Sequence, residues 1–243
     1  MSEAELRASV SRVMRGLNHD LKNPLGAADG YLDLLLQGFR GELSSEQRQT
    51  LERVRALIAS GVSILEDVVA YTRASIGELR THPTETDVPA LVRMTMQRHE
   101  ARAANAGIAL EFRTAEGTQS ARAVTDGDLV AQVVDRLLAN ALDHTPDGGR
   151  VEVVVSGDAG GVDVSVSDTG PGVRAEDRER VFLAFERGPA PARGRETAGI
   201  GFGLALAKSL TERLHGELQL EESAGTGARF RLRIPKQLEV DAV

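Results

Sequence analysis

The first third of the chain alternates apolar and polar residues with the period of an amphipathic helix. Apolar side chains recur every three or four positions from about residue 3 to residue 38, where the sequence Gly-Phe-Arg-Gly interrupts them. The pattern resumes after residues 44–47 (Ser-Ser-Glu-Gln), which form a capping box, and continues to about residue 72. Two long helices joined by a short turn are typical of an antiparallel helical hairpin, which we expect here.

A helical hairpin on its own leaves part of each apolar stripe uncovered. Dimerisation into a four-helix bundle would bury both stripes, and the alternative is packing against the domain that follows. We therefore expect residues 1–76 to form a homodimer with a four-helix bundle at its centre.

The pattern changes around residues 82–84 (His-Pro-Thr), which mark a boundary. Beyond it, helical segments are mixed with short β-branched runs and hairpins. The expected fold class is therefore α+β, with an α/β sandwich made of one mixed sheet and helices on one face. We expect a hairpin at 1–76, a linker at 77–87, a domain at 88–236 and a tail at 237–243. The expected helices cover residues 88–104, 129–142, 178–185 and 204–214, and the expected strands cover residues 108–113, 151–155, 162–167, 217–221 and 228–234.

Composition narrows the possible functions. The chain has 29 lysines and arginines against 36 aspartates and glutamates, so its formal net charge of −7 argues against nucleic acid as a partner. The absence of cysteine excludes disulfides, zinc–thiolate sites and thiol catalysis. No apolar run has the length of a membrane span, and the N-terminus lacks a signal-peptide core. We expect a cytoplasmic chain with no membrane segment, which could be the end of a longer sensor.

A histidine followed by an aspartate lies within the first helical pattern. His19 is two residues from both Leu17 and Leu21, so at about 100° per residue it points away from the apolar stripe. If Asp20 accepts the proton of one imidazole nitrogen, the other nitrogen is left as a nucleophile. Pro24 removes a backbone donor, so the helix should bend beside the histidine. The alternative is an ordinary solvated histidine on a helix surface.

Three glycine-bearing segments mark the second half of the chain. Residues 168–172 (Asp-Thr-Gly-Pro-Gly) end a strand, residues 199–204 (Gly-Ile-Gly-Phe-Gly-Leu) open a helix, and residues 225–227 (Gly-Thr-Gly) join two strands. Glycines before a helix N-terminus let the backbone approach phosphate oxygens, whose charge the helix dipole favours. Asp168 ends an apolar strand, so we expect it at a pocket edge, where it can accept a hydrogen bond from an exocyclic amine such as that of adenine. Each glycine segment alone is also what an ordinary turn contains.

An asparagine on the predicted helix 129–142 adds a fourth feature. Asn140 shares a face of that helix with Arg136 and Asp143, opposite the leucines that face the core. Its amide oxygen is a suitable hard ligand for Mg²⁺ that bridges nucleotide phosphates. The alternative is an amide on a solvated helix surface.

In chain order, these features resemble the transmitter core of bacterial sensor histidine kinases. The order is His-Asp-x-x-Asn-Pro-Leu in a helical hairpin, an asparagine helix, Asp-x-Gly-x-Gly, Phe-x-x-Phe, Gly-x-Gly-x-Gly-Leu and Gly-Thr-Gly. That core joins a dimerisation and histidine-phosphotransfer hairpin to an ATP-binding domain of the gyrase–Hsp90–histidine kinase–MutL type. The resemblance covers nearly the whole chain.

The resemblance implies roles for individual residues. His19 corresponds to the phospho-acceptor, Asp20 to its base or orienting group, and Asn23 to the position that places water for dephosphorylating the partner response regulator. Asn140 corresponds to the Mg²⁺ ligand, and residues 186–198 resemble a lid over ATP. The residues expected to contact the nucleotide are Arg136, Asn140, His144, Asp168, Gly170, Gly172, Phe182, Phe185, Arg187, Gly199, Gly201, Gly203, Leu204 and Thr226. The two phenylalanines can equally be core residues.

Two positions depart from the family pattern. The family often has another asparagine where this chain has Arg136, and a lysine or arginine where it has Asp143. The loss of a cation near the triphosphate should weaken ATP binding. One hypothesis is that Arg136 supplies the missing phosphate contact, with lid arginines also compensating. The alternative is that both side chains are merely solvated.

The implied activity is that of an ATP-dependent protein-histidine kinase of a two-component system. MgATP would phosphorylate His19, and the phosphoryl group would pass to an aspartate on the receiver domain of a response regulator, with residues 76–87 as a hinge. One alternative is a degenerate dimeric phosphotransfer or scaffold protein that does not use ATP, which the two departures motivate. Another is an ATPase of the same superfamily without histidine chemistry, against which the His-Asp hairpin argues.

Overall fold

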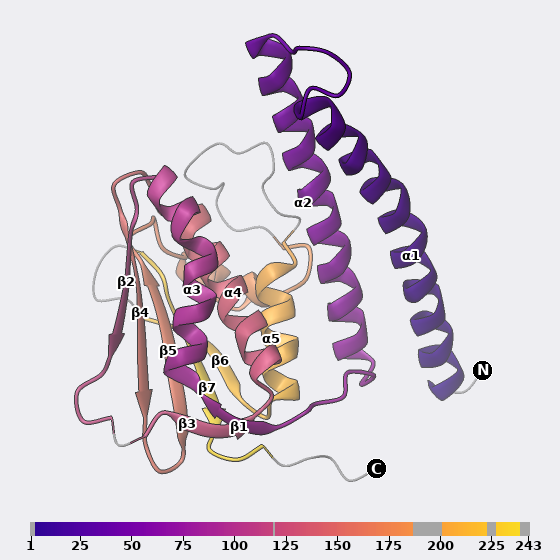
Figure 1. Ribbon diagram of the computed structural model, residues 1–243. Coiled ribbons are helices and arrows are strands. Elements are labelled where there is room, and N and C mark those ends of the chain that lie inside the picture. Colours follow the sequence, from indigo (N-terminus) through magenta and orange to yellow (C-terminus); the bar gives the residue numbers. More distant parts are fainter. Residues whose placement is uncertain (1–2, 119, 187–200, 223–226, 239–243) are drawn as a thin grey trace. The chain divides into compact units, whose positions relative to one another are not determined.

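The chain folds into two compact units, Met1–Ile76 and Gly77–Val243. The computed structural model describes residues 3–118, 120–186, 201–222 and 227–238 of the 243. In the first unit, α1 (Glu3–Leu36) and α2 (Ser45–Ser75) are joined by a short turn (Figure 1). The predicted helical hairpin is therefore confirmed. Among the described residues, no helix combines the length and apolar character that a membrane span requires.

Local signals in the sequence explain where these helices begin and how they pair. Gln47 donates its backbone N–H to the Ser44 hydroxyl at 3.2 Å, and the Ser44 N–H donates to the Gln47 side chain at 2.9 Å, which completes the capping box. Lys22 pairs with Glu66 at 2.5 Å, and Arg55 pairs with Asp29 at 3.1 Å. The antiparallel order of these ion pairs fixes the register. Each contributes little stability because its partners are largely exposed.

Pro24 lies inside α1, five residues after His19. The proline cannot donate a hydrogen bond to the helix, which is why we expect a bend beside the histidine. The bend stays a prediction.

The second unit is built on a five-stranded sheet with the strand order β2-β4-β5-β7-β6. The β2–β4 pair is parallel and the other pairs are antiparallel, so the sheet is mixed, as predicted. Its strands are β2 (Ala109–Thr114), β4 (Arg150–Gly157), β5 (Gly161–Asp168), β6 (Glu217–Glu221) and β7 (Arg229–Pro235).

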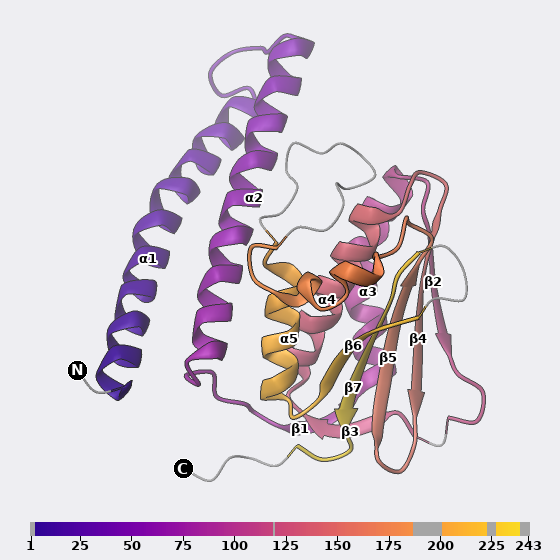
Figure 2. The ribbon, with the colours of Figure 1, turned by 180° about the vertical axis from the view of Figure 1, so that it is seen from behind.

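Three helices, α3 (Val88–Asn105), α4 (Gly127–His144) and α5 (Gly203–Arg213), form one layer against the sheet (Figures 1 and 2). Along β4, Val151, Val153 and Val155 are fully buried and alternate with half-buried residues, so one face of the strand supplies the core. Leucines of α4 complete that core from the opposite side. The core is therefore built mainly from aliphatic residues, with Phe230 also fully buried.

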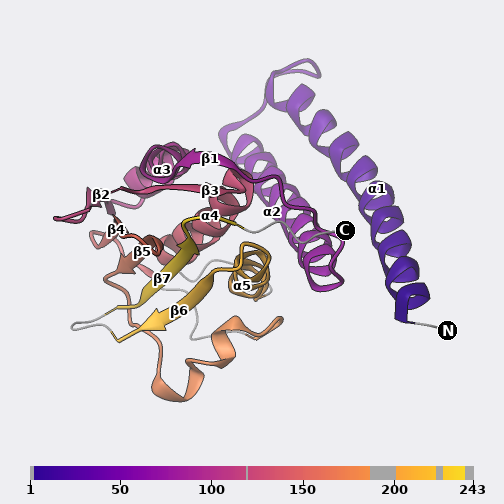
Figure 3. The same ribbon diagram turned by 90° about the horizontal axis from the view of Figure 1, so that it is seen from below.

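Two short segments behave differently from the prediction. Residues 84–87, assigned to the linker from the sequence, form β1 (Thr84–Asp87), which pairs antiparallel with β3 (Arg122–Thr125) in a separate two-stranded sheet (Figure 3). The predicted helix at 178–185 is wrong. The structure has two 3₁₀ turns, η1 (Ala175–Asp177) and η2 (Arg180–Phe182), and Phe185 has a left-handed φ of 67°, which an α-helix cannot contain.

The segment between the two units is held by the second unit. Arg213 of α5 donates to the Leu79 carbonyl at 3.2 Å, and the backbone N–H of His82 donates to the Asp126 carboxylate at 2.8 Å. The same carboxylate caps α4 by accepting the N–H of Leu129 at 3.1 Å. Asp126 thus ties the start of α4 to the segment that follows the hairpin.

Candidate functional sites

The first candidate site lies on the exposed side of α1. His19 and Asp20 are 75% and 80% exposed, and the Nδ1 of His19 lies 3.1 Å from a carboxylate oxygen of Asp20. The amide nitrogen of Asn23, one turn further on, is 3.2 Å from Nε2 and 3.4 Å from Nδ1 of the same ring. The structure therefore brings together the three residues that the sequence singled out in this helix. If the proton on Nδ1 is donated to Asp20, Nε2 carries the lone pair, which faces the Asn23 amide in this structure.

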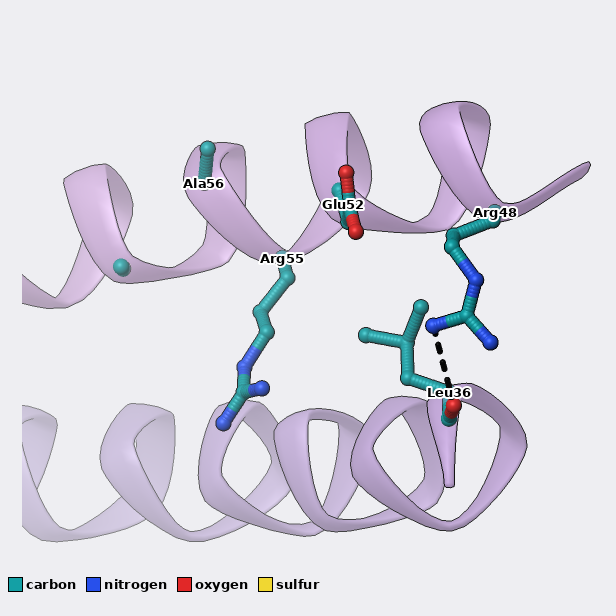
Figure 4. Close-up of a pocket in the computed structure, with 6 residues that line it drawn as sticks. Leu36, Arg48, Glu52, Arg55 and Ala56 are labelled. Carbon is teal, nitrogen blue, oxygen red and sulfur yellow. Dashed lines mark hydrogen bonds between the residues drawn. The ribbon is translucent and has the colours of Figure 1, made fainter. Parts of the chain in front are cut away.

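A hollow of about 490 Å³ also lies in the hairpin, at the end where α1 and α2 are connected (Figure 4). Arg48 closes one side by donating to the Leu36 carbonyl at 3.2 Å, and Arg55 points from α2 toward α1. Leu36 is 17 residues from His19, which is about 25 Å along a helix. The hollow is therefore separate from the histidine site.

The second candidate site begins at the end of β5. Asp168 is 7% exposed, and its Oδ1 accepts the backbone N–H of Gly170 at 2.8 Å and that of Ala228 at 3.3 Å. Among the described residues, no group donates to the second carboxylate oxygen, Oδ2. Burial raises the pKa of Asp168, while the two N–H groups and the charge of His144 oppose that rise. A half-satisfied carboxylate in this position is suited to accept a hydrogen bond from a ligand.

Glycines surround this carboxylate because the backbones approach too closely for a side chain. A Cβ on Gly170 would lie 2.6 Å from the carbonyl oxygen of His144, and one on Gly172 would lie 2.9 Å from that of Gly227. Gly172 also has a positive φ of 74°. The Asp-x-Gly-x-Gly sequence is therefore a tight turn that clamps Asp168 against the end of α4 and the start of β7.

A third part of the site is the start of α5. Phe202 occupies the N-cap position and offers no side-chain hydrogen bond, so the N–H groups of the first turn have no partner within the helix. Gly201 has a φ of 80°, and a Cβ there would lie 2.4 Å from the carbonyl oxygen of Glu186. An uncapped N-terminus preceded by such a glycine can receive phosphate oxygens. Leu204 is half-buried in the first turn.

The polar face of α4 borders this helix start. The Cδ atom of Arg136 lies 4.0 Å from the Cβ position of Gly203, which places the arginine stem beside the first residue of α5. Asn140 is half-buried one turn further along α4, and His144 ends the helix next to Gly170. Arg136, Asn140 and His144 thus run in order from the start of α5 to the Asp168 turn.

Residues that could hold a metal are few. Within the part of the chain that the structure describes, no group of three or more His, Cys, Asp or Glu side chains has the arrangement to hold a metal ion. The amide of Asn140 offers one hard oxygen ligand. It therefore fits Mg²⁺ only if phosphate oxygens and water supply the remaining ligands.

The two predicted phenylalanines both contact other aromatic rings. Phe182 meets Phe230 edge-on at 6.0 Å between centroids, and Phe185 meets Phe202 edge-on at 4.6 Å. Lys208 of α5 lies 5.0 Å from the Phe182 ring centre. Phe182 therefore packs against the core strand β7, whereas Phe185 is 71% exposed and contacts Phe202, the residue that precedes α5.

The acidic residues on the other edge of α4 have partners on α3 that the sequence did not reveal. Arg102 donates to Asp143 at 2.5 Å, and His99 lies 3.0 Å from Asp135. Asp143 is thus ion-paired rather than merely solvated. Sequence patterns could not identify these partners, because the contact depends on how α3 packs against α4.

Several predicted site residues lie outside the described residues. These are Arg187, Gly199 and Thr226, together with residues 187–198 of the expected lid and Gly225.

Two family models match the chain. Residues 9–77 match the His Kinase A (phospho-acceptor) domain, and residues 125–238 match the histidine kinase-, DNA gyrase B- and HSP90-like ATPase. The first match contains His19, and the second contains Asn140 and Asp168.

Curated relatives are sensor kinases that are longer than this chain. Adaptive-response sensory kinase SasA of Synechococcus sp. (strain JA-2-3B'a(2-13)) is 31% identical over 237 residues, which cover 96% of this chain and 62% of the relative. Sensor-like histidine kinase SenX3 of Mycobacterium tuberculosis (strain ATCC 25618 / H37Rv) is 30% identical over 240 residues, which cover 97% of this chain and 56% of the relative. The chain thus spans about three fifths of the length of these relatives.

Solved structures share the fold. Full-length ShkA in complex with AMPPNP has a TM-score of 0.76 and 26% identity, covering 94% of this chain and 46% of that chain. Histidine kinase ThkA, solved in complex with response regulator protein TrrA, has a TM-score of 0.62 and 22% identity, covering 97% of this chain and 64% of that chain. The two matched domains, with relatives and structures of the same kind, establish that this chain belongs to the sensor histidine kinases.

Proposed function

We propose that this chain is an ATP-dependent histidine kinase core that phosphorylates His19 and passes the phosphoryl group to a response regulator. The observation that carries the proposal is the exposed imidazole of His19 with the Asp20 carboxylate 3.1 Å from its Nδ1. The Asp168 turn and the uncapped start of α5 supply a second site suited to a nucleotide.

The two ring nitrogens of His19 have different roles in the proposed reaction. Asp20 accepts a hydrogen bond from the Nδ1–H group, which leaves the Nε2 lone pair to attack the γ-phosphorus of ATP. A bond forms between Nε2 and phosphorus while the bond from phosphorus to the β–γ bridging oxygen breaks, and ADP leaves with that oxygen. Asp20 then stabilises the positive charge on the ring or takes its proton. Asn23, whose amide lies beside Nε2, is placed to position water when phosphate is removed from a partner.

The nucleotide would extend along the polar face of α4. Oδ2 of Asp168 would accept a hydrogen bond from the adenine amine, with Gly170, Gly172 and His144 around the base. The phosphates would lie at Gly201, Gly203 and Leu204, where the first-turn N–H groups, which have no partner within the helix, would meet them. Asn140 would hold Mg²⁺ together with phosphate oxygens, and Arg136 would contact the phosphates from beside Gly203. Phe182, Phe185, Arg187, Gly199 and Thr226 complete the proposed set.

We also propose that the hairpin forms a homodimer. Leu17 and Leu21 remain 43% exposed in one chain although they lie on the apolar stripe of α1, and Leu57 of α2 is 51% exposed. A second hairpin would bury these side chains in a four-helix bundle. The proposed second partner is the receiver domain of a response regulator, which accepts the phosphoryl group on an aspartate.

The test is incubation of the purified chain with γ-labelled ATP and Mg²⁺. We expect acid-labile, base-stable label on the wild type and none on His19→Gln, because only His19 is placed as the acceptor. His82→Gln is the matched control and should be labelled like the wild type. Nucleotide binding, followed by titration with a fluorescent ATP analogue, should persist in His19→Gln and fall sharply in Asn140→Asp.

Equal label on His19→Gln would show that another residue is the acceptor. If the wild type binds no nucleotide, the chain does not use ATP, and the phosphotransfer or scaffold alternative replaces this proposal.

A further inference from the structure

The exposed side of α4 is divided into two stripes. At about 100° per residue, Asn140 and His144 fall on the side of the candidate nucleotide site, with Arg136 next to them. Asp143 lies about 60° from Asn140 and Asp135 lies further round in the same direction, toward α3. Both carboxylates therefore lie on one side of the stripe that would meet the phosphates, and Asp143 is only about 20° from Arg136.

Each of these carboxylates has a basic partner on α3. Arg102 donates to Asp143 at 2.5 Å, and the two side chains are 30% and 39% exposed. His99 lies 3.0 Å from Asp135, and the nearby Arg98 lies 3.7 Å from the same oxygen. The two basic partners are three residues apart on α3, and the two carboxylates are eight residues apart on α4.

The two ion pairs differ in their distance along α4 from Asn140, which lies on the side of the candidate nucleotide site. Asp143 is one turn from Asn140 on the same side of α4, whereas Asp135 is five residues before it. A free carboxylate one turn from a phosphate-binding asparagine would repel the triphosphate, and it would also compete for Mg²⁺. The short ion pair with Arg102 removes both effects.

We infer that Arg102 is a positioning residue for MgATP, which holds Asp143 on the α3 side of α4 and neutralises it. The inference rests on the proposed nucleotide site. In this arrangement Arg102 acts through Asp143 and need not touch the nucleotide. Asn140 then faces the phosphates with the nearby carboxylate of Asp143 neutralised by Arg102.

The size of the effect follows from electrostatics. A unit charge several ångströms from a charged ligand at a partly exposed site changes its affinity by about tenfold at low ionic strength, and the change shrinks as salt screens it. The effect should depend on the phosphates, so adenosine should be almost unaffected.

The experiment measures the Kd of ATP and adenosine by calorimetry for the full chain at low and high salt. Arg102→Gln should weaken ATP binding by about tenfold at low salt and less at high salt, with adenosine unchanged. Asp143→Asn alone should bind ATP at least as well as the wild type, and adding it to Arg102→Gln should restore the affinity. Arg98→Gln is the matched control. Arg98 lies on the same helix, but its partner Asp135 is also held by His99, so this substitution should change the Kd of ATP little.

Three outcomes would overturn the inference. Arg102→Gln with unchanged ATP affinity would show that Asp143 does not need its partner. Equal loss of ATP and adenosine, with no rescue by Asp143→Asn, would show a structural role for Arg102. A wild type that binds adenosine and ATP equally weakly would remove the proposed nucleotide site itself, and that failure is recognised before any variant is compared.

Discussion

The carbonyl oxygen of Asp168 lies where a side chain on Gly227 would have to be. A Cβ built on Gly227 would be 1.9 Å from that oxygen, and Gly227 has a φ of 108°. The backbone N–H of Asp168 also donates a hydrogen bond to the carbonyl of Ala228, the next residue after Gly227, at 3.0 Å. The start of β7 and the end of β5 are thus held together by this backbone hydrogen bond and by the Ala228 N–H that the Asp168 carboxylate accepts at 3.3 Å.

Gly227→Ala should therefore displace Asp168. We expect a loss of about 3 kcal/mol or more of stability in the second unit, because both the clash and the left-handed φ must be relieved. Hydrogen exchange should rise at the end of β5, and adenosine binding should weaken. Gly127→Ala is the matched control, because its Cβ would meet Thr86 at an ordinary 3.5 Å. Normal adenosine affinity in Gly227→Ala would contradict the prediction.

The burial of Asp168 destabilises its charged form, so the stability of the second unit should depend on pH. Burial raises the pKa of this carboxyl above its ordinary 3.8, so the folded chain holds the proton more tightly than the unfolded chain. Its contribution to stability is therefore complete below the unfolded pKa and is lost as pH rises through the folded pKa.

Asp168→Asn should remove that loss while keeping an oxygen for Gly170 and Ala228. We expect the second unit of the variant to melt at a higher temperature than the wild type at pH 7 and at a similar temperature near pH 3.5, with adenosine binding abolished. The measurement is Tm against pH, with Glu179→Gln as an exposed carboxylate control. A lower Tm for Asp168→Asn at pH 7 would refute this account.

Asp135 should show the opposite pH dependence. Burial alone would raise its pKa, but hydrogen bonding and charge from His99, with Arg136 and Arg98, bring the pKa below its ordinary value. Such a group stabilises the fold above its unfolded pKa, and the contribution is lost as pH falls through the folded pKa.

Asp135→Asn should cost about 1–3 kcal/mol at pH 7, because it leaves the largely buried His99 with a weaker partner. The difference from the wild type should narrow as pH falls below the ordinary pKa of 3.8 toward the lower folded pKa, where Asp135 becomes neutral like the asparagine. The measurement is the free energy of urea unfolding of the wild type and Asp135→Asn between this pH and pH 7. Arg98→Gln, whose side chain is 60% exposed, should cost less than about 1 kcal/mol. A penalty that stayed constant with pH would show that the charge of Asp135 is not involved.

The long periodic elements could be predicted from the sequence because their signals are local. The helical stripes, the capping box at Ser44 and the hairpin between β4 and β5 each depend on residues close in the chain. Asp168 and Asn140 can also be proposed as candidate site residues from the sequence, since one ends an apolar strand and the other lies on the polar side of a helix.

The features that the sequence did not reveal depend on distant contacts. Four residues are too few to show a β period, so the pairing of Thr84–Asp87 with Arg122–Thr125 could not be read. The short helix expected at 178–185 failed because Phe185 turns to a left-handed conformation, where its N–H donates to the Gly201 carbonyl at 3.2 Å. Arg102 became visible as the partner of Asp143 only when α3 and α4 were packed together.

The contacts that hold the segment after the hairpin decide how the two units can move. Arg213 binds the Leu79 carbonyl only three residues after Ile76, where the hairpin unit ends. Three residues of extended chain span at most about 11 Å. The connection is therefore short: while the Arg213–Leu79 contact holds, any movement of one unit relative to the other requires rotation of backbone dihedrals between Ile76 and Leu79. Lengthening this short stretch, rather than the region near Thr84, is what would uncouple the two halves of the chain.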